Sequence, residues 1–423
     1  MERLQAVRGM HDTLPGDTLK WRLLEQTIQS VLGSYCYQEI RLPILEKTDL
    51  FSRSIGAGTD IVNKEMYTFQ DRNAESLTLR PEGTAGCVRA LLQHGLIYSG
   101  TQRIWYQGPM FRHERPQKGR QRQFYQVGAE VFGVDSAEID AEIILICARI
   151  WNALGVKGVR LQLNSLGSYS ARQNYRNLLV DYLSANRDQL DGDSINRLET
   201  NPLRILDSKN PDMQALIGAA PSLLDSIDDE SAEHFATLRD LLDANAVEYE
   251  INPRLVRGLD YYNRTVFEWT TDRLGAQGTI CAGGRYDDLV EQLGGKATPG
   301  VGFAMGLERI LELVEFSNAD LSSASPRIYQ VLVGNAAMKN GLRLAEQLRD
   351  EIPTLRLQMH CGGGSFKSQF KKADKSQADY ALIMGDEEAA KNTAQIKPLR
   401  EDRAQYEISQ DRLVDEITRL LHL

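Results

Sequence analysis

The sequence predicts an α+β domain that is built on an antiparallel sheet and interrupted by a helical insertion, followed by a small α/β domain. Two strand-like segments at 103–111 and 122–132 flank a short basic stretch, which is typical of a long hairpin. Apolar residues recur at helical spacing through about 170–246, and strand-like and helix-like segments alternate after residue 326. At 423 residues the chain is also too long for one hydrophobic core. We therefore expect two domains, 1–325 and 326–423.

The first domain is expected to begin with a helix and a strand that contains proline. Apolar residues at helical intervals predict the helix over 17–35. The segment 37–46 has strand composition, and Pro43 within it is typical of a sheet edge or an irregular pairing. Strand-like sequence resumes at 247–252 and 265–270, after the helical block. That block, whose acidic run at 228–230 suits a helix N-terminus, is therefore interpreted as an insertion between two halves of one domain.

The C-terminal domain alternates between strand and helix patterns. A polar stretch with proline, FSNADLSSASP at 316–326, is typical of a linker before it. The expected elements, in order, are a strand at 328–333, a helix at 336–350, a strand at 355–359, a helix at 366–377 and a strand at 380–384.

Composition and cysteine use exclude several classes of protein. Hydrophobic residues make up 42% of the chain and charged residues 25%, an ordinary globular balance. The most apolar stretch, 143–148, is too short to cross a membrane, and the N-terminus lacks a secretory core, so we expect a cytoplasmic protein without a membrane partner. The five cysteines are scattered singly and form no CxxC pair, which predicts neither a disulfide framework nor a metal site.

The charge of the chain is unevenly distributed. Its net value is −9, and the segment 181–250 alone carries 16 acidic and 5 basic residues. By contrast, 112–122 has 5 basic residues and 1 acidic residue, and 326–376 has 9 basic and 4 acidic residues. Basic patches on an acidic body are compatible with a bound polyanion, although any single patch could simply be a solvated face.

The predicted hairpin carries polar residues where a packed sheet would have apolar ones. Because side chains alternate along a strand, Phe124, Gln126 and Glu130 share one face, while residues 125, 127, 129 and 131 form an apolar back. Arg112 at the hairpin can grip phosphate oxygens in a bidentate way. This polar face is either a substrate floor or a solvated sheet face.

The glycine-rich segment GVGFAMGLER at 300–309 permits close approach of the backbone before a helix begins. A tight packing turn between a strand and a helix would look the same, so this segment alone leaves both interpretations open.

Taken together, these segments resemble the three motifs of class II aminoacyl-tRNA synthetases. The helix and strand up to Pro43 resemble the first motif. The second, Arg-x-Glu followed by a loop and Arg-x-x-x-Phe, is matched by Arg112, Glu114, Arg120 and Phe124. The glycine-rich strand that runs into Glu308 and Arg309 is similar to the third, with Ala304 where many members have glycine. The resemblance implies the class II synthetase fold.

Three further segments resemble the histidine-specific members of this class, the histidyl-tRNA synthetases. They are LRPEGTAG at 79–86, LVRGLDYYNRTVFEW at 255–269 and AGGRYDDLV at 282–290. The resemblance runs from the N-terminal RGMHD at 8–12 to a C-terminal anticodon-binding domain. It implies the ATP-dependent ligation of L-histidine to tRNA(His) through a histidyl-adenylate, with release of AMP and diphosphate.

The resemblance also implies roles for single residues. Glu82, Thr84 and Gln126 resemble the residues that bind the amine of histidine in this family. Glu130 and Tyr262 resemble the residues that recognise its imidazole. Tyr261 and Tyr286 resemble the walls of its pocket, although these tyrosines could also be aromatic core. The histidine-binding set is Glu82, Gly83, Thr84, Arg112, Gln126, Glu130, Arg257, Tyr261, Tyr262 and Tyr286. When another amino acid binds in a pocket built to pair with both ring nitrogens, buried polar groups lose their partners, and this costs several kcal/mol of binding free energy. An editing domain is therefore not expected.

The same resemblance implies an ATP site and two catalytic arginines. ATP would contact Arg112, Glu114, Arg120, Phe124 and Arg309, with Phe124 against the adenine. Arg257 and Arg112 are the expected catalytic residues, and Arg257 would stand at the α-phosphate. A carboxylate is already ionised at neutral pH, so no general base is expected. ATP would enter with Mg²⁺, which its phosphates and water hold, and no prosthetic group or protein-bound metal is expected.

Partners follow from the resemblance as well. We expect a homodimer, because the first class II motif forms a two-fold interface in the family. The tRNA would meet the basic loop through Arg115, Gln117 and Lys118, and the C-terminal domain through Lys367, Lys371 and Lys372. These lysines could instead merely solvate their helix.

Two rival functions remain at the level of sequence. Regulatory subunits of ATP phosphoribosyltransferase keep this fold and bind histidine, but they lack the anticodon-binding domain and have eroded signatures. A class II synthetase for another amino acid would share the three motifs. The intact Arg257, the segment at 255–269 and the presence of 326–423 favour the histidine-specific synthetases over both.

Overall fold

The computed structural model describes residues 3–56, 59–117, 119–206, 208, 210–275, 278–316 and 325–422, with no side chain described at 199. The chain divides into two compact units, Met1–Glu315 and Phe316–Leu423. Most of the expected linker at 316–326 lies outside the described residues.

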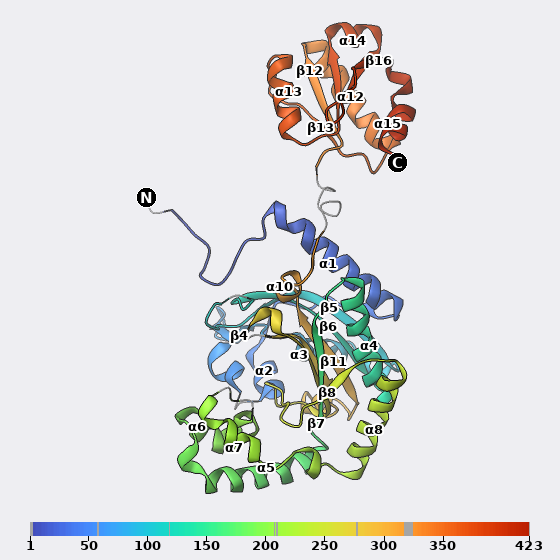
Figure 1. The fold of residues 1–423 in the computed structure, drawn as a ribbon. Coiled ribbons are helices and arrows are strands. Elements are labelled where there is room, and N and C mark those ends of the chain that lie inside the picture. Colours follow the sequence, from blue (N-terminus) through green and yellow to red (C-terminus); the bar gives the residue numbers. More distant parts are fainter. Residues whose placement is uncertain are drawn as a thin grey trace. The chain divides into compact units, whose positions relative to one another are not determined.

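The first unit is organised around an eight-stranded sheet (Figure 1). Its central six strands are antiparallel, and each edge adds one parallel pair, β1 with β5 and β7 with β8. The strands in spatial order are β1 (Gln38–Glu39), β5 (Gln102–Phe111), β6 (Gln123–Phe132), β11 (Gly300–Gly306), β10 (Thr279–Arg285), β9 (Asn263–Thr271), β7 (Val159–Ser165) and β8 (Tyr249–Ile251).

The predicted hairpin is confirmed as β5 and β6, which pair without a break from Gln102 opposite Phe132 to Phe111 opposite Gln123. The alternation of faces is confirmed too. Val127, Ala129 and Val131 belong to the main hydrophobic core, whereas the intervening side chains of β6 point to the opposite face of the sheet.

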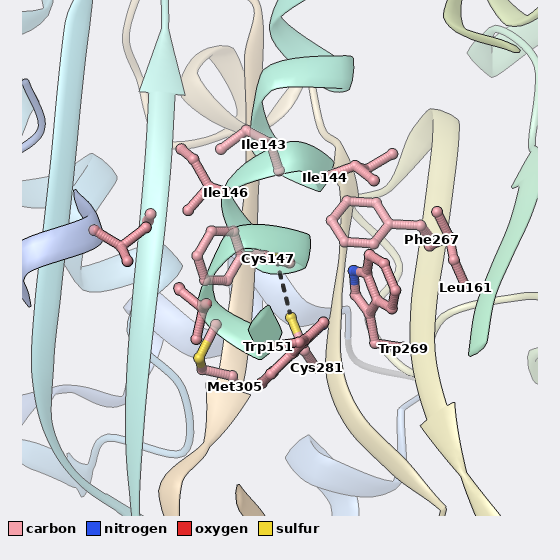
Figure 2. Packing of buried hydrophobic residues seen from close by; sticks show 14 of the residues in the cluster. Ile143, Ile144, Ile146, Cys147, Trp151, Leu161, Phe267, Trp269, Cys281 and Met305 are labelled. Carbon is pink, nitrogen blue, oxygen red and sulfur yellow. Dashed lines mark hydrogen bonds between the residues drawn. The ribbon is translucent and has the colours of Figure 1, made fainter. Parts of the chain in front are cut away.

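Three helices cover the apolar face of the sheet. They are α1 (Pro15–Ser34), α4 (Ala137–Ala153) and α8 (Asp229–Ala244). Figure 2 shows α4 side chains, among them Ile146 and Cys147, between Met305 of β11 and Trp269 of β9. The Sγ atoms of Cys147 and Cys281 are 3.6 Å apart, and all five cysteines are free thiols.

The strand predicted over 37–46 is wrong in its extent. The structure contains β1 in the main sheet and β2 (Leu45–Lys47) in a separate small sheet. Pro43 lies between them and has no N–H to donate to a ladder. The side chain of Arg80 holds the break by donating to the carbonyl oxygens of Leu42 at 2.9 Å and Pro43 at 3.3 Å. The small sheet has the order β2-β4-β3, with β3 at Tyr67–Gln70 and β4 at Ser76–Leu79.

Four shorter α-helices of the first unit lie outside the segment at 169–244. They are α2 (Thr48–Ile55), α3 (Thr84–Gln93), α9 (Leu289–Gln292) and α10 (Leu307–Leu311). The α3 side chains Val88 and Leu91 are buried in a second hydrophobic cluster on the other face of the sheet. A cavity described below lies on that face.

Residues 169–244, which we call the insertion, are helical as predicted (green in Figure 1). The α-helices of the insertion are α5 (Tyr169–Ala185), α6 (Gly192–Thr200), α7 (Gln214–Ala219) and α8. The acidic run predicted to start a helix does so: the Asp228 carboxylate accepts the N–H of Ser231 at 3.0 Å and caps α8.

The second unit has a five-stranded mixed sheet of order β13-β12-β14-β15-β16. The predicted strands and helices at 328–385 are present within a few residues of their expected bounds. The two antiparallel strands β15 and β16 and the two helices α14 and α15 were not predicted. The elements are β12 (Ile328–Val333), α12 (Asn335–Glu351), β13 (Leu357–Met359), α13 (Phe366–Lys375), β14 (Tyr380–Gly385), α14 (Asp386–Lys391), β15 (Thr393–Pro398), β16 (Tyr406–Ser409) and α15 (Leu413–Leu421). Across both units, no helix in the described chain is long and apolar enough to span a bilayer.

Candidate active site

A cavity of about 230 Å³ on the α3 side of the main sheet collects almost all the residues expected to bind histidine and ATP. Of the residues predicted from sequence, those lining it are Glu82, Gly83, Thr84, Arg112, Glu114, Arg120, Phe124, Gln126, Glu130, Arg257, Tyr261, Tyr262 and Arg309. They come from segments more than two hundred residues apart, which only the fold brings together.

At the floor of the cavity, Glu130 of β6 is surrounded by hydroxyl donors. Its side chain is 1% exposed. Thr84 and Tyr106 each donate to Oε1 at 2.8 Å, and Tyr286 donates to Oε2. Burial raises the pKa of Glu130 to about 8, against the lowering effect of these hydroxyls.

Tyr286 departs from the expectation that it walls the cavity. Its ring lies behind the lining, with its centroid 5.5 Å from that of Tyr261 and 6.1 Å from that of Tyr262. Its hydroxyl reaches Glu130 instead. The structure therefore places Tyr286 where it supports three lining residues, because the two tyrosines on the 255–262 segment occupy the wall in front of it.

Glu82 lines the cavity and forms hydrogen bonds with the start of α3. Its carboxylate accepts the backbone N–H groups of Thr84 at 2.7 Å and Ala85 at 3.0 Å. Burial raises its pKa, and the two N–H donors oppose that change. A buried carboxylate in this position presents negative charge to the cavity and suits a cationic amine.

Three arginines face the other part of the cavity. Arg112 packs over the ring of Phe124 at 5.3 Å from its centroid, and Arg120 pairs with Glu114. Arg309 donates to the carbonyl oxygens of Gly119, at 2.9 Å, and of Thr279. Burial lowers the pKa of Arg112, Arg120 and Arg309, and mutual repulsion lowers it further. A polyanion in the cavity would relieve that repulsion.

Arg257 lies between these arginines and the tyrosine wall. Its guanidinium is 5.7 Å from the ring centroid of Tyr262 and forms an ion pair with Glu268 of β9. The Glu268 carboxylate also accepts the Thr279 hydroxyl at 3.0 Å, so it is held from both sides. Arg257 Nε is buried and has no hydrogen-bond partner within the described part of the chain.

The glycine-rich third segment forms β11 beneath the cavity. A Cβ atom on Gly302 would overlap with Glu130 Oε2 and would lie 2.5 Å from the carbonyl oxygen of Ala129. The close approach of β11 to β6 therefore requires glycine here. Glu308, at the end of the segment, accepts the N–H of Tyr125 at 2.9 Å, and burial raises its pKa to about 7.

Two residues of the 115–121 loop and the three lysines of α13 that were expected to bind tRNA are exposed. Arg115 and Gln117 are both solvent-accessible, and the loop closes through a turn in which Gln117 and Arg120 exchange backbone hydrogen bonds of 2.9 and 3.0 Å. Lys118 lies outside the described residues. In the second unit, Lys367, Lys371 and Lys372 of α13 line one open surface hollow together with Ser365 and Ser368.

Several contributors to the site were not predicted from the sequence, among them Tyr106, Glu268 and Leu259. Tyr106 donates to Glu130 and lies opposite Gly128, where a Cβ atom would overlap with its ring. With the register of the hairpin known, an aromatic residue opposite a glycine would have indicated that the ring of Tyr106 lies over Gly128, close to Glu130. Leu259, which lines the cavity, and Glu268, which pairs with Arg257, both lie in the signature segment at 255–269, but nothing in that segment distinguishes them from their neighbours.

The signature segment at 282–290 contributes a scaffold residue besides Tyr286. Arg285 is fully buried and pairs with Asp140 of α4 at 3.1 Å and with Asp287 at 3.1 Å. It also donates to the carbonyl oxygens of Val134 and Ser136. This guanidinium ties β10 to α4 rather than facing the cavity.

Comparisons with known proteins agree with this geometry. The histidyl-tRNA synthetase family model matches residues 9–310, and the anticodon-binding domain model matches 328–420. A histidine–tRNA ligase from Hydrogenovibrio crunogenus is 57% identical over 98% of this chain and 97% of its own length.

Solved structures give the same result. The apo histidyl-tRNA synthetase of S. aureus is 32% identical, with a TM-score of 0.81 over 98% of this chain and 99% of the relative. A Bacillus halodurans chain described as an ATP phosphoribosyltransferase regulatory subunit/histidyl-tRNA synthetase shares the fold at 20% identity, with a TM-score of 0.65 over 91% of this chain and 99% of that chain. The chain thus belongs to the histidyl-tRNA synthetase family of class II aminoacyl-tRNA synthetases.

Proposed function

We propose that this chain ligates L-histidine to tRNA(His) in two steps at the cavity. In the first, the histidine carboxylate attacks the α-phosphate of ATP, which forms histidyl-adenylate and releases diphosphate. In the second, a hydroxyl at the 3′ end of tRNA attacks the activated carbonyl and releases AMP. The observation that carries the proposal is one cavity with buried carboxylates and tyrosines at one end, three arginines at the other and Arg257 between them.

Histidine fits the carboxylate end. Glu82, with Gly83, Thr84 and Gln126 beside it, would take the amine. Glu130 and Tyr262 would pair with the two imidazole nitrogens. Tyr261 covers the pocket and Tyr286 holds Glu130 in place.

ATP fits the arginine end. Arg112, Arg120 and Arg309 would hold phosphates, and Phe124 offers its ring to the adenine on the side away from Arg112, with Glu114 nearby. Mg²⁺ enters as part of the nucleotide substrate, held by phosphates and water. Arg257 stands between the two ends, where its charge would stabilise the pentacoordinate α-phosphate. We further propose that the reaction takes place in the cytoplasm, which cell fractionation would check.

The direct test is exchange of labelled pyrophosphate into ATP with each of the twenty amino acids. Histidine alone should support exchange. A protein that bound histidine without exchange would behave as a regulatory subunit, and a different active amino acid would refute the substrate assignment.

The ionisation of Glu130 gives a pH-dependent prediction. Because burial raises its folded pKa to about 8, Glu130 is mostly protonated below that pH and lacks the negative charge that strengthens a hydrogen bond from an imidazole N–H. We expect the KM for histidine to fall by roughly fivefold to tenfold between pH 7 and 8.5, since one ionisation of that pKa controls the competent form. Glu130→Gln should weaken histidine binding, flatten this dependence and leave the KM for ATP largely unchanged. An equal slope in wild type and variant, or equal loss of both substrates, would contradict the role of Glu130.

We also propose that the chain forms a homodimer through its first motif. β1 lies at the edge of the main sheet, next to α1, and pairs only with β5 in the described chain, so its outer edge is open to a second copy. Light scattering should give twice the chain mass of 47.5 kDa. A fully active particle with the mass of one chain would contradict this.

Finally, we propose that tRNA contacts both units. The loop with Arg115, Gln117 and Lys118 would meet the acceptor end, and 326–423 would bind the anticodon through Lys367, Lys371 and Lys372. In this assignment 1–325 is the catalytic domain and about 170–246 is its insertion.

A further inference from the structure

One arginine of the insertion contacts the backbone on either side of a residue that lines the cavity. Arg172, in the first turn of α5, donates from the same nitrogen to the carbonyl oxygens of Asp260 and Tyr262, both at 2.9 Å. A second nitrogen of this guanidinium is 3.8 Å from the Asp260 carboxylate. These two carbonyls flank Tyr261, so one side chain of the insertion grips the backbone on either side of a cavity-lining residue.

Asp260 is held by other parts of the chain as well. Asn201, also in the insertion, donates to the Asp260 carboxylate at 2.9 Å, and the Asp260 N–H donates to the carbonyl oxygen of Ile55 at 3.1 Å. A Cβ atom on Gly56 would lie only 2.6 Å from Asp260 Oδ2. The segment at 255–262 is therefore fixed between the insertion and the end of α2.

The apolar contacts lead to the same place. Tyr175 and Leu179 of α5 belong to the same hydrophobic cluster as Tyr261, Tyr262 and Tyr286. The buried face of α5 thus shares one hydrophobic cluster with the tyrosine wall, and a shift of α5 changes the support of that wall.

We infer that Arg172 is a positioning residue for histidine: the insertion holds the segment carrying Arg257, Tyr261 and Tyr262 in its binding geometry through Arg172. The inference rests on the proposed function and adds to it a determinant of histidine affinity outside the cavity. ATP binding is largely independent of Arg172, because Arg112, Arg120 and Phe124 come from the β5–β6 hairpin and Arg309 from α10.

The test compares Arg172→Gln, Arg172→Lys and the control Arg187→Gln, an exposed arginine of the insertion, in the full-length protein. Histidine and ATP affinities are measured by calorimetric titration, KM and kcat by pyrophosphate exchange, and folding by thermal denaturation. For Arg172→Gln we expect the histidine Kd and KM to rise by about tenfold or more, equivalent to about 1.4 kcal/mol. The KM for ATP should change by less than about twofold, a difference of about 0.4 kcal/mol. Arg172→Lys should recover part of the loss, since an ammonium can still donate to carbonyls.

Three outcomes would overturn the inference. They are an unchanged histidine Kd in Arg172→Gln, equal weakening of histidine and ATP with a lowered melting temperature, and an equal effect in Arg187→Gln. If Arg172→Gln fails to fold, the histidine and ATP affinities of Arg172→Lys are compared with those of the wild type instead. The wild-type titration reports separately on the proposed function, because a wild-type protein that bound no histidine would refute the substrate and not merely the role of Arg172.

Discussion

Replacing Arg257 with alanine should slow histidine-dependent pyrophosphate exchange by about 10²–10³-fold, the usual loss when one preorganised donor to a developing charge is removed. The guanidinium is already oriented before any ligand binds, because Glu268 and the ring of Tyr262 hold it. It therefore needs little rearrangement as the α-phosphate gains charge. Rates at saturating histidine and ATP would measure the effect.

The pairing with Glu268 makes a second variant necessary. Arg257→Ala leaves the Glu268 carboxylate largely buried without its cation, and an unpaired buried charge by itself destabilises a protein. The double variant Arg257→Ala/Glu268→Gln removes that charge and should remain slow. Recovery of the rate in the double variant would mean that the orphaned carboxylate, and not the missing guanidinium, caused the loss. Arg254→Ala, an exposed arginine three residues earlier, is the matched control and should react at the wild-type rate.

Deleting residues 326–423 should separate the two steps of the reaction. The cavity is formed entirely by residues of the first unit, which has its own hydrophobic clusters, so histidine activation should change little. Charging of tRNA(His) at limiting tRNA should fall by about 100-fold or more, the equivalent of about 2.7 kcal/mol of lost binding free energy. Thermal denaturation would check that the truncated chain is folded. A folded, truncated enzyme that charged tRNA at the full rate would refute the assignment of this region.

A milder version of this experiment keeps the domain and changes only its charge. The variant with Lys367, Lys371 and Lys372 all replaced by glutamine removes the exposed cations of the α13 hollow and touches no buried side chain. The salt dependence of tRNA affinity should then become shallower, because fewer counterions are released on binding. An unchanged salt slope would mean that these lysines only solvate their helix.

Local patterns of apolar and polar residues along the chain determined much of the fold. The two-residue period placed the β5–β6 hairpin within one residue at each of its four ends and showed which face was apolar. The helical period located the insertion, and the alternation after residue 326 located the first half of the second sheet. The histidine and ATP residues came from resemblance to a family, and the fold brings nearly all of them to one cavity.

What the sequence could not determine depends on contacts between segments that are distant along the chain. Nothing in the run from 263 to 271 shows that Glu268 faces Arg257, because a strand's own period does not say which strand will lie beside it. The role of Arg172 could not be predicted either. In the sequence it resembles any arginine on a helix surface, and only the folding of the 255–262 segment against α5 gives it its partners.

The tertiary structure also decided the electrostatics of the site. Glu130 has an ordinary carboxyl in the sequence, and only its burial in the fold raises its pKa, against the hydrogen bonds from Thr84, Tyr106 and Tyr286. Tyr286 was expected on the pocket wall because the family signature names the residue but not its depth. Residue types and their order along the chain therefore determined which chemistry is present, whereas packing determined which groups face one another and how far each is from water.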